Sequence, residues 1–180
     1  MASTTSGSGL DAVEYQPSGG STGVSFDWGF AVSLTLGALG SLVGRPIGPE
    51  LSLPVALGSL VLAAVGLALG EALRRGNGVA RRIQIGFHSL LVLVGIPILL
   101  PTVQAFQQGR SDLLYTLVLS IILFFVVSPS EIWLLMRPGS RRWYGIVDPK
   151  EALERHSGGW LVRTITWAVV GGFLNAFAPF

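Results

Sequence analysis

The chain has 180 residues, of which 50% are hydrophobic and 12% are charged, and its formal net charge is +2. Soluble domains usually carry about 25% charged residues, so a soluble fold of this length could not bury so much apolar surface. The absence of cysteine excludes disulfides, thiolate catalysis and cysteine-ligated metals. The composition therefore predicts an all-α integral membrane protein with the bilayer as its main solvent.

The N-terminal residues 1–27 are rich in Ser, Thr and Gly, and they include three acidic residues but no basic one. Such a segment cannot bury enough apolar surface to order itself, so we predict a disordered N-terminal tail. It also lacks the basic n-region of a signal peptide.

Five apolar segments follow and predict five transmembrane helices, at residues 28–44, 51–73, 83–106, 113–136 and 160–178. The first is at the short end of what a hydrocarbon core of roughly 30 Å requires. Small residues recur at every fourth position of this segment: Gly29, Ser33, Gly37 and Ser41. Such a strip allows another helix backbone to approach closely. Packing within the chain is the simpler interpretation, and a dimerisation seam is the alternative.

The connection between the second and third segments, residues 74–82, holds four of the twelve basic residues: Arg74, Arg75, Arg81 and Arg82. So short a connection predicts that the two helices pack as an antiparallel hairpin. Within the third segment, Pro97 and Pro101 each remove a backbone donor, which predicts a kink.

The fourth segment contains an unexpected helix-start signal, Ser128-Pro129-Ser130-Glu131. A Ser at the N-cap, with Pro next and Glu three residues on, is a capping box. Inside an apolar run, this pattern predicts either a kink or a break of the helix at Ser128. A break would leave free backbone N–H groups that could bind an anion.

Residues 137–159 form the longest internal loop, and their arginines and aromatic residues are typical of the lipid headgroup region. The arginines nearest to the fourth segment are Arg137, Arg141 and Arg142. Later in the loop, Asp148-Pro149-Lys150-Glu151 is a second helix start, and it predicts a short interfacial helix at about residues 149–156.

The distribution of basic residues predicts the orientation. If the 74–82 turn lies inside, the 137–159 loop also lies inside, and together they hold four plus five, or nine, basic residues. The outside loops then hold two, Arg45 and Arg110. The positive-inside rule therefore places the N-terminus inside and the C-terminus outside. Because all but one of the twelve basic residues are arginines, the composition indicates a prokaryotic gene and hence a multi-pass protein of the cell membrane.

Ionisable residues within membrane helices are candidates for a functional site. Four occur here, and all lie toward the inner side: Glu71, His88, Glu131 and Arg163. His88 and Glu131 are expected at the same depth, and with Ser128 they could form a protonatable site in an inward-facing cavity. The alternative is that each residue is satisfied locally, by a helix cap, a nearby arginine, a carbonyl group or the lipid headgroups.

No zinc, nucleotide-binding or serine-hydrolase motif occurs, no cofactor or metal is expected, and the small net charge gives no support for nucleic-acid binding. The leading interpretation is a non-enzymatic scaffold or accessory subunit, in contact with lipid and, through its small-residue seams, with other membrane subunits or a second copy. The alternative is a small transporter or channel for an ion, proton or small solute, built on the polar residues. A third interpretation is a lipid-acting enzyme in which Arg141 and Arg142 hold a phosphate.

Overall fold

The computed structural model describes residues 18–45, 47 and 50–177 of the chain. All regular secondary structure in these residues is helical, which confirms the predicted all-α class for them. Residues 1–17 of the predicted tail, and the predicted end of the fifth segment at residue 178, lie outside the described residues.

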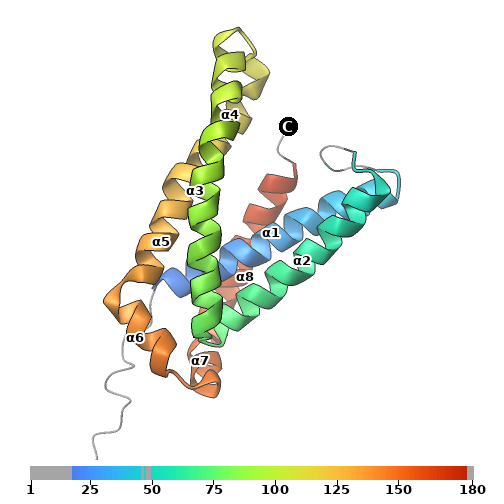
Figure 1. The fold of residues 1–180 in the computed structure, drawn as a ribbon. Coiled ribbons are helices and arrows are strands. Elements are labelled where there is room, and N and C mark those ends of the chain that lie inside the picture. The colour runs from blue at the N-terminus through green and yellow to red at the C-terminus, as the bar shows by residue number, and fades with distance from the viewer. Residues whose placement is uncertain (1–17, 46, 48–49, 178–180) are drawn as a thin grey trace, which may run out of the picture.

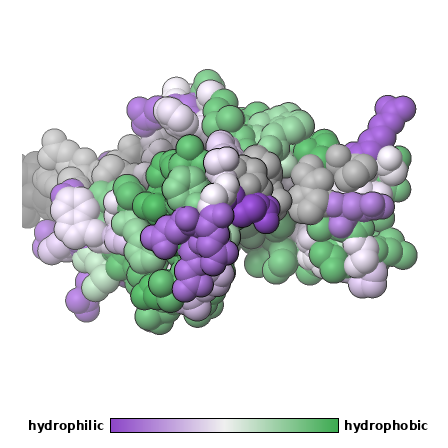
Figure 2. Space-filling view, turned by 90° about the horizontal axis from the view of Figure 1, so that it is seen from above, coloured by the Kyte–Doolittle hydropathy of each residue, from purple (hydrophilic) through white to green (hydrophobic). Residues whose placement is uncertain are grey.

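Within the described residues, three helices are long and apolar enough to cross a membrane. They are α2 (Leu53–Arg74), α3 (Gly78–Gln107) and the continuous helix Leu114–Met136, which consists of α4 (Leu114–Ile121), a π-helical segment (Ile122–Val127) and α5 (Ser128–Met136). Their boundaries lie within a few residues of the predicted ones. Seen from above, hydrophobic side chains cover much of the helix flanks, and hydrophilic side chains gather in separate groups (Figure 2). These features support the prediction of a membrane protein.

Two further long helices are α1 (Ser18–Leu42) and α8 (Gly158–Ala176). The bounds of α8 match the fifth predicted segment, but α1 begins at Ser18 and not at Trp28, so the predicted start is wrong and residues 18–27 are helical. The small and polar residues that suggested a tail make contacts with other helices. Ser25 Oγ, for example, donates a hydrogen bond to the Thr164 carbonyl oxygen on α8 at 3.3 Å.

The helices form two arms that join at one end (Figure 1). At the other end α2 diverges from α3 and α4–α5, whereas α8 stays in contact with α4, because Tyr115 OH donates to the Leu174 carbonyl oxygen at 3.3 Å. One arm consists of α1, α2 and α8, and the other of α3 and the helix α4–α5. The predicted hairpin of α2 and α3 is therefore wrong, because α2 packs along α1 while α3 packs against α5. Small residues explain this choice of partner. An ideal Cβ at Gly66 would lie 3.1 Å from the Asp27 carbonyl oxygen, and one at Gly70 would overlap the Trp28 ring.

The backbones of α1 and α8 also lie very close to each other. An ideal Cβ at Gly29 would lie 3.0 Å from the Ala168 carbonyl oxygen, and one at Gly172 would lie 2.6 Å from the Gly29 carbonyl oxygen. Asn175 Nδ2 on α8 donates to Ser33 Oγ on α1 at 2.8 Å. At Gly29 and Ser33, the small-residue strip thus packs within the chain, as the simpler interpretation predicts.

The fourth helix does not break at Ser128. This residue has helical dihedral angles, φ −63° and ψ −46°, and both its backbone N–H and its hydroxyl donate to the Leu123 carbonyl oxygen. Pro129 has no N–H to donate, and the π-helical turn before it accommodates the missing bond. The predicted capping box is therefore wrong, because Ser128 is not at a helix end. The anion site that depended on a break is lost with it.

Two short helices close the end at which the arms join, α6 (Pro138–Ile146) and α7 (Pro149–Arg155) (Figure 1). α7 confirms the predicted short helix at about residues 149–156, whereas the sequence predicts no helix over α6. Trp143 and Tyr144 of α6 are buried and belong to the main apolar cluster of the molecule. The other buried members of this cluster are Val24, Leu73, Ala80, Leu135 and Ala152.

The arginine-rich 74–82 turn lies against these two short helices. Gly76 has φ +74°, and an ideal Cβ there would lie 2.3 Å from Val147 Cγ1, so only glycine fits both the backbone and the space. Asn77 then caps α3, because its Oδ1 accepts from the backbone N–H groups of Val79 and Ala80. Gly76 and Ala80 of the turn are therefore packed inside the molecule, whereas Arg75, Asn77, Val79 and Arg82 are exposed.

Candidate functional site

A group of polar side chains is buried where α1 meets α3 and α5. It is termed the buried polar cluster and consists of Asp27, Gln84, His88, Ser128 and Glu131. Asp27 is 4% exposed and the other four residues are 0% exposed. Gln84 and His88 are one turn apart on α3, and Ser128 and Glu131 are one turn apart on α5, so each pair shares a helix face.

Asp27 and Gln84 connect α1 to α3 within this cluster. Gln84 Nε2 donates to Asp27 Oδ1 at 2.8 Å. The other oxygens of the two side chains, Asp27 Oδ2 and Gln84 Oε1, are buried without a hydrogen-bond partner among the described residues. A buried polar atom without a partner costs about 1–3 kcal/mol. The pair therefore has spare acceptors for a proton, a cation or a hydrogen-bond donor.

His88 and Ser128 connect α3 to α5. Their Nδ1 and Oγ atoms are 3.1 Å apart, and the Ser128 hydroxyl proton is directed to the Leu123 carbonyl oxygen at 2.9 Å. Because Ser has one hydroxyl proton, His88 Nδ1 must be the donor to Ser128 Oγ. This assignment leaves His88 Nε2 as an unprotonated acceptor, and Nε2 is buried without a partner among the described residues.

Glu131 is the least satisfied member of the cluster. Both of its carboxyl oxygens are buried, and neither makes a hydrogen bond of standard geometry within the described residues, although the Thr22 side chain on α1 is close enough to stabilise the charged form. An ideal Cβ at Gly23 of α1 would lie 3.5 Å from Glu131 Oε2 and 3.8 Å from Gln84 Nε2, so the α1 backbone covers both side chains. Within the described part of the chain, neither Glu131 nor Asp27 forms an ion pair with Lys or Arg.

The neighbour of Glu131 on α6 is Tyr144. Its phenol is buried, and within the described residues its OH has no hydrogen-bond partner. Burial raises the pKa of Tyr144, and a negative charge on Glu131 raises it further. The phenol therefore stays protonated and can donate a hydrogen bond at the edge of the cluster.

This arrangement favours reversible protonation as its chemistry. An unpaired carboxylate in a low-dielectric interior is strongly unfavourable, so Asp27 and Glu131 are stable there as neutral acids or with a bound cation. Among the described residues, no group of three or more His, Asp or Glu side chains is placed to hold a metal ion. The cluster offers proton acceptors on three helices, at Asp27, His88 and Glu131.

The structure brings together three of the five residues predicted for the polar site, His88, Ser128 and Glu131. Glu71 lies elsewhere and is paired with Arg74 at 2.7 Å and with Arg75 at 2.8 Å, as its local interpretation predicts.

The fifth predicted residue, Arg163, is also outside the cluster. It is exposed on α8, within a helix whose outward side chains are largely apolar. Neither the cluster nor the Glu71 pair includes it.

The arginines predicted to set the topology make contacts near the joined end of the arms. Arg81 Nε donates to the Leu135 carbonyl oxygen at 2.8 Å, and the Arg137 guanidinium lies 3.7 Å from the centre of the Trp133 ring. Arg82, Arg141 and Arg142 are exposed. These positions suit contact with lipid headgroups and leave the buried polar cluster without a basic partner.

Two members of the cluster, Asp27 and Gln84, were not predicted. Asp27 was assigned to the tail, although the small-residue repeat of the first segment continues back from Gly29 through Ser25 to Ser21 and could have revealed the helix. Gln84 does not ionise, so a search restricted to charged residues passes over it. An uncharged amide within an apolar segment is the signal that could have identified it.

No protein-family model, no curated protein and no solved structure is significantly similar to this chain.

Proposed function

We propose that the chain is a multi-pass protein of a prokaryotic cell membrane, with five spans formed by α1, α2, α3, α4–α5 and α8. The packing of α1 along α2, and of α8 along α1, supports their crossing the bilayer together. The nine basic residues of the 74–82 turn and the 137–159 loop support placing the joined end of the arms inside. The N-terminus then lies inside and the C-terminus outside.

We further propose that the protein is a small, non-enzymatic transporter or channel whose cycle depends on proton binding at the buried polar cluster. One observation carries this proposal: two carboxyl groups and an imidazole nitrogen, from three helices, have buried acceptor atoms without partners. Unpaired ionisable groups are costly inside a membrane, and proton relays are one of the functions they serve there. Proton binding would also alter the contacts among the three helices, which couples it to their arrangement.

Variants of the two acids in the full chain, reconstituted in liposomes, test this function. Infrared difference spectroscopy between about pH 5 and pH 9 follows protonation of buried carboxyl groups. Flux of protons and of a panel of small solutes is measured under an imposed pH gradient. We expect Glu131→Gln and Asp27→Asn to lose both a titrating carboxyl signal and the gradient-driven flux.

The matched control is Glu71→Gln, because Glu71 is a membrane-helix carboxylate that is paired with Arg74 and Arg75 outside the cluster. This variant should keep both the cluster's signal and the flux. Wild-type flux in Glu131→Gln, or no flux of any solute in the wild type, would contradict the proposal.

The scaffold or accessory-subunit alternative is favoured by a different observation, the exposed apolar side chains of α2. Residues such as Val61 and Leu62 could contact a partner helix as well as lipid. A stoichiometric partner that co-purifies in mild detergent would support this alternative, and a monomer without partners would count against it.

A further inference from the structure

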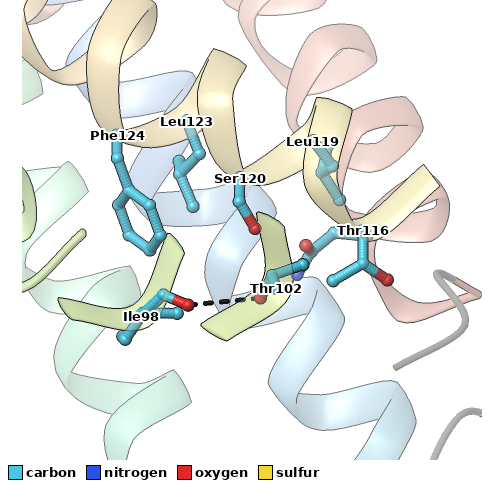
Figure 3. Close-up of a pocket in the computed structure, with 8 residues that line it drawn as sticks. Ile98, Thr102, Thr116, Leu119, Ser120, Leu123 and Phe124 are labelled. Atoms are coloured by element: carbon cyan, nitrogen blue, oxygen red, sulfur yellow. Dashed lines mark hydrogen bonds between the residues drawn. The ribbon is translucent and has the colours of Figure 1, made fainter. Parts of the chain in front are cut away.

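A cavity of about 210 Å³ lies between the two arms, where α3 and the helix α4–α5 approach α8. α3 contributes Ile98 and Thr102 to its wall, α8 contributes Asn175, and the α4 and π-helical segments contribute the remainder. Thr102 and Ser120 point toward each other from facing helices (Figure 3). The cavity is separate from the buried polar cluster, with which it shares no residue.

The wall combines apolar side chains with four polar groups. The polar groups are the hydroxyls of Thr102, Thr116 and Ser120 and the carboxamide of Asn175. Among the described residues that line the cavity none is charged, so a charged solute would lose its hydration without gaining a counter-ion. The volume is also below the roughly 300–1,000 Å³ of sites for drug-sized ligands. We infer that the cavity binds a small uncharged molecule with one or two hydrogen-bonding groups, such as a short-chain alcohol or amide.

Contacts within the protein hold the cavity wall in place. Asn175 Nδ2 donates to Ser33 Oγ at 2.8 Å, which orients the carboxamide from the α8 side. Phe124 lies directly on the α3 backbone, because an ideal Cβ at Gly95 would be 2.6 Å from its ring. Its position at the cavity wall is therefore fixed by contact with α3, and a site with fixed walls loses less entropy on binding.

One residue links this cavity to the buried polar cluster. Leu123 lines the cavity, and its carbonyl oxygen accepts the Ser128 hydroxyl, which in turn accepts from His88. A solute that moves the π-helical turn would therefore disturb the His88 contact, and a change at the cluster would reach the cavity. The inference deepens the proposed function by naming its solute class, and it rests on that function only for the statement that the solute moves across the membrane.

Photolabelling of the full chain tests binding without requiring transport. The probe is a diazirine derivative of butanol, added to the protein in liposomes of phosphatidylethanolamine and phosphatidylglycerol, and labelled residues are identified by mass spectrometry. We expect label within residues 98–124, displaced by excess butanol. Thr102→Leu puts a larger apolar side chain in the cavity and removes a hydroxyl group. We expect it to weaken binding of the probe, and therefore labelling, about tenfold.

Thr166→Leu is the matched control. Thr102 and Thr166 both donate their hydroxyl to the carbonyl oxygen four residues earlier, at Ile98 and Val162 respectively, but only Thr102 lines the cavity. The control variant should label like the wild type. Ser120→Ala, which removes a hydroxyl without adding bulk, should lower labelling about threefold, and it keeps the test valid if Thr102→Leu does not fold.

Label spread over the exposed faces of α2 and α3, label displaced by lipid but not by butanol, or equal labelling of Thr102→Leu and wild type would overturn the inference. Labelling that persists in Glu131→Gln while its flux is lost would support binding in the cavity as a step separate from transport. Proton flux without any cavity label would remove this inference and leave the proposed function intact.

Discussion

At the scale of single residues, the acidic residues of the membrane helices differ in whether they form an ion pair with arginine. Glu71 has two arginine partners within 2.8 Å, on its own helix and the turn that follows, and its charge is accounted for locally. Glu131 is fully buried, and no basic partner approaches it in the described part of the chain. The same residue type is thus structural in one helix and a candidate for proton binding in another, and only the packing of α1 over α5 makes the difference.

His156 is a second buried histidine, outside the membrane helices at the end of α7. Its ring lies between Trp143 and Trp160, with centroid distances of 5.1 Å and 4.2 Å. A carbonyl oxygen can only accept, so Nδ1 must donate to the Arg74 carbonyl oxygen at the end of α2. This bond fastens the cap of α6 and α7 to the arm formed by α1 and α2.

The cap should loosen in acid. Burial lowers the pKa of His156 below its ordinary value of about 6.5, so the unfolded chain binds this proton more readily than the folded one. The stabilisation is therefore complete above about pH 6.5 and is lost as the pH falls below that value. The hydrogen-exchange protection factor of residues 138–156, which is the exchange rate corrected for the base-catalysed intrinsic rate, should fall by at most about tenfold per pH unit, the limit for one titrating group.

The control for this pH dependence is His156→Asn, because Asn keeps a donor near the position of Nδ1 but does not titrate. Its protection factor over the same segment should be nearly independent of pH between about 5 and 8. An acid-dependent loss of protection of the same size in this variant would show that another group is responsible.

At the scale of elements, glycine positions decide which helices pair. Gly171 and Gly172 are adjacent on α8, but an ideal Cβ at Gly172 would lie 2.6 Å from the Gly29 carbonyl oxygen, whereas one at Gly171 would meet no atom within 4 Å. Gly172→Ala must therefore push α8 away from α1, which we expect to destabilise the protein by about 1–3 kcal/mol. Gly171→Ala should be neutral or stabilising by up to about 1 kcal/mol, because Ala has the higher helix propensity.

Reversible unfolding of both variants in mixed detergent micelles, followed by circular dichroism, measures this difference. The pair is informative because the two substitutions add the same atom to the same helix. Equal stabilities would mean that α1 and α8 are not in backbone contact.

Helices that depend only on their own sequence are predicted well, and helices that depend on distant packing partners are not. The helices α2, α3, α4–α5 and α8 follow from hydropathy, which is a property of each segment alone. The N-terminal part of α1 depends on partners instead, because Ser25 and Gly29 are favourable there only when α8 packs against them. The Trp143 and Tyr144 rings of α6 are likewise buried by residues distant in the sequence.

The candidate site was predictable to a similar extent. The position of each residue along its predicted helix puts His88 and Glu131 at one expected depth, and in the structure His88 and Ser128 lie within hydrogen-bond distance. The sequence pattern at Ser128 was misinterpreted as a helix start, since a Pro after a Ser also fits a π-helical turn in a continuous helix. The short turn at 74–82 likewise brings α2 and α3 together only at the ends that it connects. Their directions are set by other packing, of α2 against α1 and of α3 against α5.

At the scale of the whole molecule, the two arms differ in how they bury polar groups. The arm of α1, α2 and α8 uses small residues and brings helix backbones into contact, as at Gly29 and Gly172. The arm of α3 and α4–α5 is joined to it by the buried polar cluster and by the α6–α7 cap. The proposed change in the protonation of the cluster would therefore act at the junction of the arms, where a small rotation would also move α4 against α8 at the Tyr115–Leu174 contact.

The number of spans sets the side of both termini and can be measured directly. With the 74–82 turn inside, α2 begins outside and α5 ends inside. If α1 and α8 also cross, the N-terminus lies inside and the C-terminus outside; if neither crosses, both positions are reversed. We expect a phosphatase reporter fused after Phe180 to be active outside the cell and a fluorescent reporter fused before Met1 to fluoresce inside it. A phosphatase fusion truncated after Gly109 should be active under either topology and controls for expression and export. A cytoplasmic reporter at Phe180 would contradict the five-span arrangement, and with it the depth at which the buried polar cluster is proposed to bind protons.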